Sequence, residues 1–188
     1  MSRVGIDLDG VMYDFSGAAG RWLAAQTGRP LGDFPYPDRW NTWESWGMDK
    51  EEWLQQVHAG VDAGYIFANG PVEPYGVATL HRLRDAGHSL HIVTARNFGQ
   101  PGASERNTRD WLRRNAIPYD TLTFDHDKTS VPTDVFIEDN LGNYDALEAA
   151  GTVAVLRDQP WNADDGQRRR ISHLAELPGF VDTLELAA

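Results

Sequence analysis

The hydrophobic pattern of this chain alternates between short apolar runs and longer segments with helical spacing. Residues 3–11 begin with β-branched Val4 and Ile6 and continue into an Asp-Gly pair, which is typical of a buried strand that ends in a sharp turn. Further apolar runs predict strands over residues 90–93, 119–124, 135–137 and 153–156. Apolar residues at helical spacing predict helices over residues 16–28, 49–58, 75–87, 104–115 and 145–150, and a last helix near residues 169–175.

Strands that alternate with helices predict an α/β fold, namely a doubly wound, Rossmann-like parallel sheet with right-handed crossovers. Residues 16–73 do not fit this alternation, because they hold helical and aromatic patterns but no strand pattern. We interpret this segment as a small helical cap inserted after the first strand, over the carboxyl ends of the sheet, where such folds bind ligands. Residues 1–15 and 74–188 would then form the core domain.

The composition narrows the chemistry that the chain can perform. Its 188 residues fit one domain with an insertion, and the absence of cysteine excludes disulfides, a thiolate nucleophile and thiolate metal sites. The histidines lack the paired spacing of a zinc site, so any metal is expected to be a hard cation bound by oxygen. The formal net charge of −11 opposes binding along a nucleic-acid polymer. Without a membrane-length apolar run or a signal-peptide pattern, we expect a cytoplasmic protein with no membrane partner.

Two carboxylates stand directly after the first predicted strand, where a buried core would exclude them. Asp7 and Asp9 are two residues apart, so in an extended chain both side chains leave the same side of the strand. They repel each other unless a cation or a proton lies between them. Taken alone, the pair is also compatible with an ordinary Asp-Gly hairpin turn. An EF-hand is excluded, because the later ligands and the closing glutamate are missing.

Polar residues also follow two other predicted strands. Thr94 follows one and Glu138-Asp139 follows another, with Lys128 in the loop ahead of the latter. Each of them alone is an ordinary strand, capping or surface residue. Because parallel strands bring their carboxyl ends to one sheet edge, we expect these side chains to meet the two aspartates there. Such a cluster suits Mg²⁺ and a phosphate, with Lys128 and Thr94 on the phosphate oxygens and a carboxylate that attacks phosphorus.

The same residues, in this order, resemble the motifs of the haloacid dehalogenase superfamily of phosphotransferases. The resemblance covers residues 1–15 and 74–157 and rests on Asp7-Leu8-Asp9-Gly10-Val11, Thr94, Lys128 and Glu138-Asp139. Within the superfamily the chain is most similar to the 5′(3′)-deoxyribonucleotidase group. That second similarity rests on Asp14-Phe15, on Asp127-Lys128-Thr129 and on a helical cap of this length.

The resemblance implies a role for each motif residue. Asp7 would be the nucleophile that forms an aspartyl-phosphate, and Asp9 would protonate the leaving oxygen and then activate water. The backbone carbonyl of Asp9 would join Asp7 and Asp139 as ligands of Mg²⁺. Thr94 and Lys128 would hold the phosphate.

Positions beside the motifs depart from the family pattern or suggest a supporting role. A second small hydroxyl residue usually follows the threonine, whereas here Ala95, which is still assigned to the phosphate site, and Arg96 follow it. Arg96 is a candidate for a supporting contact or for substrate contact, because a guanidinium pairs well with phosphate. Glu138 stands where an aspartate is usual and is assigned to a supporting or substrate contact. Asn140 is grouped with it, although its position favours the cap of the next helix.

The inserted segment is rich in aromatic residues. Trp40, Trp43 and Trp46 are three apart, a spacing that places them along one side of a helix or turn. Trp40, Trp43, Tyr65 and Phe67 either pack the interior of the cap or form a pocket for a nucleobase.

Together these expectations favour a magnesium-dependent phosphomonoesterase that hydrolyses a (deoxy)nucleoside 5′-monophosphate through an aspartyl-phosphate. A phosphatase of sugar phosphates or other metabolites is the alternative with the same chemistry. A non-catalytic domain that binds phosphorylated ligands is the alternative of another class. The expected partner is a small phosphorylated substrate, and a homodimer is left open as the assembly.

Overall fold

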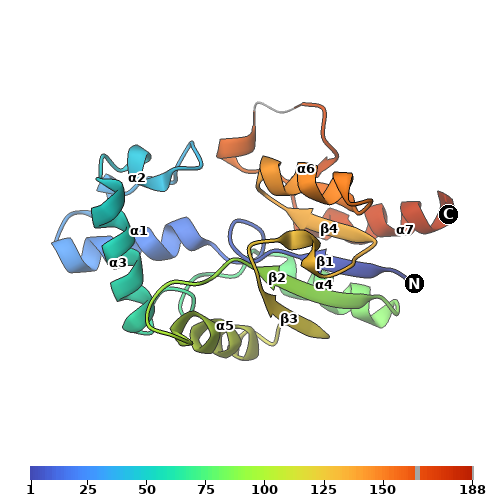
Figure 1. Cartoon of the computed structure of the whole chain (residues 1–188), viewed down its shortest axis with the longest axis horizontal. Helices are drawn as coiled ribbons and strands as arrows, with labels where there is room; N and C mark the ends of the chain where they lie inside the picture. Colours follow the sequence, from blue (N-terminus) through green and yellow to red (C-terminus); the bar gives the residue numbers. More distant parts are fainter. Residues whose placement is uncertain (164–165, 188) are drawn as a thin grey trace.

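The computed structural model describes residues 1–163 and 166–187, and its centre is a six-stranded parallel sheet (Figure 1). The strands are β1 (Arg3–Ile6), β2 (Ser89–Thr94), β3 (Thr121–Phe124), β4 (Val135–Glu138), β5 (Val153–Arg157) and β6 (Arg170–Ile171). Their order across the sheet is β3-β2-β1-β4-β5-β6, which is the order of a doubly wound Rossmann sheet. The predicted fold class is confirmed.

The register of the sheet explains why the motif residues meet. In the centre, Ile6 of β1 lies between Ile92 of β2 and Ile137 of β4. One or two residues farther on, each of these three strands ends in a polar residue that the sequence analysis had singled out. The strands run in parallel, so all of these residues emerge at the same edge of the sheet.

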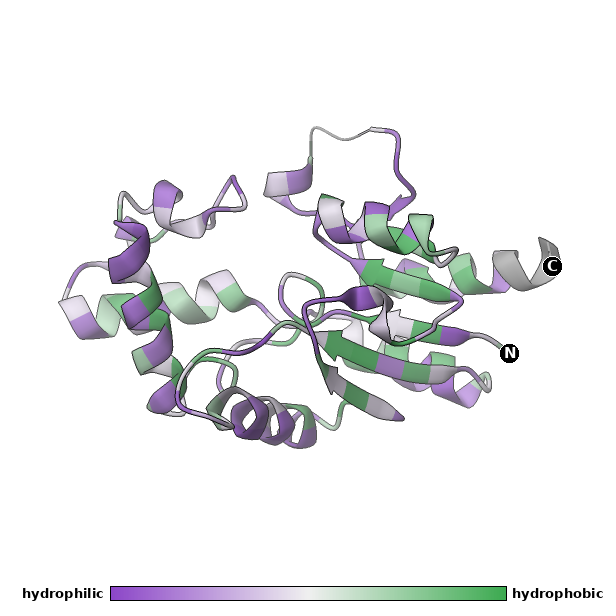
Figure 2. Cartoon of the chain, viewed as in Figure 1, coloured by the Kyte–Doolittle hydropathy of each residue, from purple (hydrophilic) through white to green (hydrophobic). Residues whose placement is uncertain are grey.

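Four helices flank the sheet, namely α4 (Gly76–Asp85), α5 (Ala103–Arg114), α6 (Leu141–Ala149) and α7 (Leu177–Ala187). Successive strand residues point to opposite faces, and the two faces form separate hydrophobic layers. Val93 and Phe136 pack with α6 on one face, whereas Ile92 and Ile137 belong to the larger core that includes apolar residues of α4 and α7. Figure 2 shows apolar residues concentrated on the strands and polar ones on the outer sides of the helices.

Between β1 and α4 the chain forms a helical segment, residues 15–68, all of which the structure describes and none of which is in a strand. It consists of α1 (Phe15–Thr27), a 3₁₀ helix (Leu31–Asp33), α2 (Thr42–Ser45) and α3 (Lys50–Asp62). The Asp14 carboxylate accepts a hydrogen bond from the amide of Gly17 and begins α1, and Gly28 ends it with a φ of 70°. In Figure 1 the segment, blue to cyan, lies beyond the carboxyl ends of the strands.

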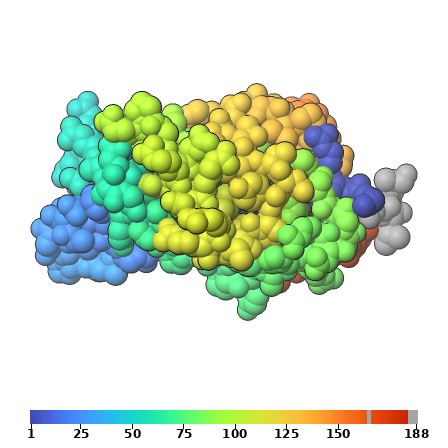
Figure 3. Space-filling view, turned by 90° about the horizontal axis from the view of Figure 1, so that it is seen from below, coloured from blue at the N-terminus to red at the C-terminus, as the bar shows by residue number. Residues whose placement is uncertain are grey.

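The helical segment is fixed to the core along the second half of α3. His58 Nδ1 accepts a hydrogen bond from the amide of Gly99 at 2.8 Å, and Asp62 Oδ1 accepts one from the amide of Gln100 at 2.6 Å. Asn107 of α5 donates to the carbonyl of Val61 at 2.8 Å. Figure 3 shows the cyan segment directly against the yellow-green chain that follows β2. These contacts hold the loop after β2, which carries part of the site, against the helical segment.

The carboxyl-terminal prediction was wrong. In place of a helix near residues 169–175, the chain forms the short strand β6 and a 3₁₀ helix over Leu174–Glu176, and α7 begins only at Leu177. The reason is an ion pair: the side chain of Arg170 pairs with Asp158, and the backbone of residues 170 and 171 pairs with β5. A side chain that is committed to a neighbouring loop stabilises extended chain where the local pattern suggests helix.

The aromatic spacing in the helical segment was also misinterpreted. Helix α2 has only four residues, so the three tryptophans do not share one side of a helix. Trp40 precedes α2 and is exposed, whereas Trp46 is buried and packs edge-on against Phe34.

No helix in residues 1–163 and 166–187 combines the length and the apolar character that crossing a membrane requires.

Candidate active site

The site begins at the turn that follows β1. The amide of Asp7 still donates to the β4 carbonyl of Ile137 at 3.1 Å, and the Leu8 carbonyl then accepts from the amides of the three residues at 11–13. Gly10 lies in this turn with a φ of 77°, and a Cβ at this position would lie 2.0 Å from Asp139 Oδ2. Glycine is therefore required both for the backbone conformation and for the close approach of a second carboxylate.

Lys128 lies beneath the turn as a buried cation. Its Nζ donates to Asp7 Oδ1 at 2.8 Å and to the carbonyl of Val93 at 2.9 Å. Asp127 positions it by capping the short 3₁₀ helix that Lys128 begins. Burial opposes the charge on Lys128, but the carboxylates of Asp7 and Glu138 outweigh burial and raise the pKa of the lysine. The residue is thus a charged donor at the floor of the site.

Three buried carboxylates, those of Asp7, Glu138 and Asp139, form a compact acidic cluster. Each offers an oxygen, and these oxygens all lie within 4.8 Å of one another. One oxygen of Glu138 accepts from the amides of Asp139 and Asn140 at 3.1 and 3.0 Å. Among the residues that the structure describes, neither Glu138 Oε2 nor Asp139 Oδ1 has a hydrogen-bond partner.

The acidic cluster carries more negative charge than its surroundings compensate. Burial, followed by repulsion from Asp7, raises the pKa of Glu138 to about 7. Burial, followed by repulsion from Glu138, raises the pKa of Asp139 well above its ordinary value. Burial also raises the pKa of Asp7, and the charge of Lys128 offsets this rise only in part. Unpartnered carboxylate oxygens in a buried cluster are the donor set that a hard divalent cation prefers, so these residues fit a metal site.

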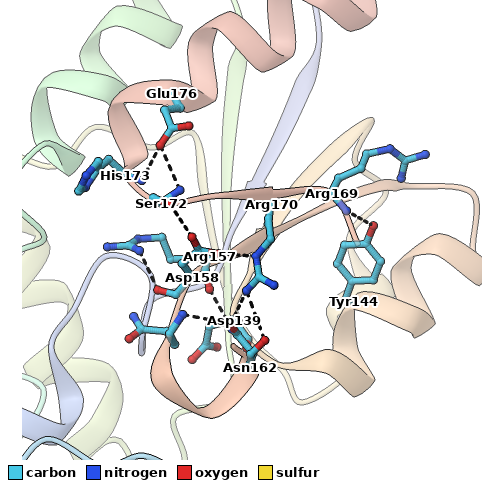
Figure 4. A network of polar contacts seen from close by, with 11 residues as sticks. Asp139, Tyr144, Arg157, Asp158, Asn162, Arg169, Arg170, Ser172, His173 and Glu176 are labelled. Atoms are coloured by element: carbon cyan, nitrogen blue, oxygen red, sulfur yellow. Dashed lines mark hydrogen bonds and ion pairs between the residues drawn. The ribbon is translucent and has the colours of Figure 1, made fainter. Parts of the chain in front are cut away.

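Asp139 is held in place by residues that follow β5 (Figure 4). Trp161 Nε1 donates to Asp139 Oδ2 at 3.1 Å, and Asn162 Nδ2 donates to its backbone carbonyl at 2.9 Å. Arg170 donates in turn to Asn162 Oδ1 at 2.9 Å and pairs with Asp158. The sequence pattern did not point to Trp161, Asn162 or Asp158, although they follow a strand whose carboxyl end lies at the same edge of the sheet.

Asp9 pairs with an arginine and is not part of the acidic cluster. Arg96 Nε and Nη2 donate to the two Asp9 oxygens at 3.0 and 2.8 Å. Arg96, predicted for a supporting or a substrate contact, lines the cavity, and its side chain is 0% exposed and pairs with Asp9.

The remaining predicted residues occupy three kinds of position. Thr94 is fully buried at the end of β2, and its hydroxyl has no partner within the described chain. Ala95 lines the cavity described below, together with Lys128. Asn140 accepts from the amide of Asn143 and caps α6, as its position favoured.

A cavity of about 340 Å³ opens above the motif residues. Its floor contains Asp7, Asp9 and Lys128, and its walls are mostly aromatic. The helical segment and the core both contribute to these walls, which comprise Phe15, Tyr36, Trp40, Trp43, Trp53, Phe67, Phe98 and Trp161.

Three of the four residues predicted for a base pocket lie in this wall: Trp40, Trp43 and Phe67. The fourth, Tyr65, packs instead against Trp22 with ring centroids 5.7 Å apart.

Comparison with known proteins relates residues 1–182 to 5′-nucleotidases. The family model described as "5' nucleotidase, deoxy (Pyrimidine), cytosolic type C protein" matches residues 1–182. A protein of Chlorobaculum tepidum named "Putative 5'(3')-deoxyribonucleotidase" is 30% identical over 155 residues, which cover 81% of this chain and 76% of that protein.

Solved structures share the fold at low sequence identity. A haloacid dehalogenase superfamily hydrolase from Geobacter sulfurreducens superposes with a TM-score of 0.62 and 16% identity, covering 96% of both chains. Another from Ehrlichia chaffeensis gives a TM-score of 0.60 and 13% identity, covering 97% of this chain and 96% of that one.

Proposed function

The chain belongs to the 5′-nucleotidase family of the deoxy (pyrimidine), cytosolic type C description, and we propose that it hydrolyses (deoxy)nucleoside 5′-monophosphates. The family match confirms the resemblance to 5′-nucleotidases that its motifs suggested and identifies the protein as a phosphatase, and its fold is that of haloacid dehalogenase superfamily hydrolases. The observation that carries the finer proposal is the position of Asp7, which lies at the floor of an aromatic cavity beside a buried lysine.

In the proposed reaction Asp7 attacks the phosphorus of the substrate. The bond between phosphorus and the nucleoside oxygen breaks, an aspartyl-phosphate forms, and Asp9 gives a proton to the leaving oxygen. Asp9 then takes a proton from the water that hydrolyses the aspartyl-phosphate, which releases phosphate and restores Asp7.

Positively charged and neutral donors would hold the phosphoryl group during these steps. The ammonium of Lys128 neutralises its developing charge, and the unpartnered hydroxyl of Thr94 donates to one of its oxygens. Ala95, which follows Thr94 in the chain and lines the cavity, would offer its backbone amide to the phosphate. The acidic cluster would bind Mg²⁺ through Asp7 and Asp139, with the Asp9 carbonyl as a further ligand, and the bound ion would neutralise phosphate charge.

The aromatic walls favour a flat, partly apolar leaving group. Stacking of a base on an aromatic side chain contributes about 1–3 kcal/mol, and Trp40, Trp43 and Phe67 offer such faces to the cavity. We therefore propose that the predicted cap, residues 16–73, which includes most of the helical segment, selects the base. A cytoplasmic location, a homodimer as the open assembly and the lack of nucleic-acid binding stay predictions.

The proposal is tested by phosphate release from a panel of substrates in Mg²⁺ buffer. The panel contains deoxy- and ribonucleoside 5′-monophosphates, sugar phosphates and 4-nitrophenyl phosphate. We expect the highest kcat/KM for a nucleotide, because its base can stack on the aromatic walls while its phosphate reaches Asp7. A higher kcat/KM for sugar phosphates would reject the base pocket but keep the phosphatase, whereas tight nucleotide binding without turnover of any substrate would reject the reaction.

Trp161→Phe is expected to weaken divalent-cation binding by about tenfold, because it removes the hydrogen bond to Asp139 while it keeps an aromatic ring beside Tyr36. The measurement is the rise in melting temperature as Mg²⁺ is titrated into the variant and the parent. Trp46→Phe is the matched control, since the indole of Trp46 bonds to a backbone carbonyl outside the site. Equal Mg²⁺ midpoints for Trp161→Phe and the parent would contradict the role given to this hydrogen bond.

A further inference from the structure

The strongest unexplained feature of the site is the pairing of Arg96 with Asp9. This residue follows the phosphate-binding positions at the end of β2 and contributes to the cavity wall, where a free guanidinium would attract phosphate. Its side chain is nevertheless 0% exposed, and its Nε and Nη2 both donate to Asp9. A two-pronged contact of this kind fixes the plane of a carboxylate as well as its distance.

The guanidinium is itself held by two neighbouring aromatic rings and on a second edge. Its central carbon lies 4.4 Å from the ring centre of Tyr13 and 4.3 Å from that of Phe67. Nη1 donates to the hydroxyl of Thr108 on α5 at 3.1 Å. The two residues also contact each other, because the Tyr13 hydroxyl accepts a hydrogen bond from the backbone amide of Phe67 at 2.8 Å.

This arrangement leaves acceptor positions of the Asp9 carboxylate available to the substrate. A carboxylate has about four acceptor positions, so each oxygen that accepts from Arg96 keeps a second lone pair. Asp9 is 30% exposed and lines the cavity, whereas the arginine that holds it does not reach solvent. Geometry that is fixed by buried groups costs no reorganisation when the substrate arrives.

We propose that Arg96 is a positioning residue for Asp9 and does not bind the substrate phosphate. The arginine makes a two-pronged contact with the Asp9 carboxylate and so holds it in one orientation within the cavity. This carboxylate is the group that transfers the proton. This inference rests on the proposed function, in which Asp9 transfers the proton. To reach a phosphate instead, the guanidinium would have to leave Asp9, Thr108 and both aromatic rings.

A double-mutant cycle tests the inference in the full-length protein with Mg²⁺. Arg96→Met, Asp9→Asn and the double variant are compared by kcat/KM on a deoxynucleoside 5′-monophosphate and on 4-nitrophenyl phosphate, whose leaving group needs no proton. We expect Arg96→Met to lower kcat/KM on the order of 100-fold for the nucleotide but less than about tenfold for the aryl phosphate. In the Asp9→Asn background the same change should cost less than about threefold, because the two residues act as one unit.

Equal losses on both substrates that persist in the Asp9→Asn background would overturn the inference, because a phosphate contact or a purely structural role would produce them. If Arg96→Met does not fold, Thr108→Val removes one support of the guanidinium and should show the same substrate dependence to a smaller degree. Thr79→Val, another buried threonine, on α4, is its control. A parent protein without turnover would reject the proposed function itself, whereas additive losses in an active enzyme would reject only the role of Arg96.

Discussion

Asp7→Asn is expected to lower kcat by a factor on the order of 10³–10⁴ or more for every substrate that the parent protein hydrolyses. The amide has nearly the shape of the carboxylate but cannot attack phosphorus, and it loses the ion pair with Lys128. Phosphate release and melting temperature are measured together, so that loss of the nucleophile is separated from loss of the fold.

Asp49→Asn provides the matched control for this experiment. It makes the same chemical change at the N-cap of α3, where the Asp49 side chain accepts from the amide of Glu51 at 2.7 Å and asparagine is an equally good cap. Its kcat should equal that of the parent. Asp7→Asn protein that folds normally and keeps kcat within about tenfold of the parent would exclude Asp7 as the nucleophile.

Removal of divalent cations by a chelator is expected to abolish turnover and to lower the melting temperature. Without a cation, Asp7, Glu138 and Asp139 repel one another in a buried site, and two of their oxygens have no partner within residues 1–163 and 166–187. Added Mg²⁺ should restore both quantities. Asp139→Asn, which removes one charged ligand, should reduce the stabilisation by Mg²⁺.

The stabilisation by Mg²⁺ should grow as the pH rises from about 5 to 8. The pKa of Glu138 is raised to about 7, above the ordinary value of 4.5, so between these values the metal-free folded protein holds a proton that the unfolded chain has lost. Stability from this group is therefore complete below about 4.5 and is lost as the pH rises through about 7. Cation binding favours the ionised cluster and opposes this loss. A melting temperature that responds equally to Mg²⁺ at both pH values would contradict this assignment.

The sequence was most informative where one strong local signal decides the structure. Apolar runs that end in acidic or hydroxyl residues identified β1, β2 and β4, and parallel order then required Asp7, Thr94 and Asp139 to share an edge. The capping role of Asn140 was equally local, since it depends on the next three residues. Such features depend on chain direction and spacing, which the sequence contains.

Features that depend on contacts between distant residues were not accessible in the same way. Arg96 and Asp9 are separated by 87 positions, and nothing in the spacing distinguishes a guanidinium that binds a carboxylate from one that awaits phosphate. Tyr65 and Phe67 are two residues apart, yet only Phe67 lines the cavity. Phe67 has a φ of 66°, a backbone conformation that no sequence pattern predicts for this residue.

The support of Asp139 by residues beyond β5 has a consequence for the order of folding. The strands β1, β2 and β4 can pair as soon as residue 138 is available, but Asn162 and Arg170 complete the hydrogen bonds around Asp139 only after β6 has joined the sheet edge. Asn162 lies 23 positions beyond Asp139, so these contacts require residues that are synthesised after β4. During synthesis the chain would therefore reach a compact, sheet-containing state before its acidic cluster is properly arranged, and competence for catalysis would be among the last properties that it acquires.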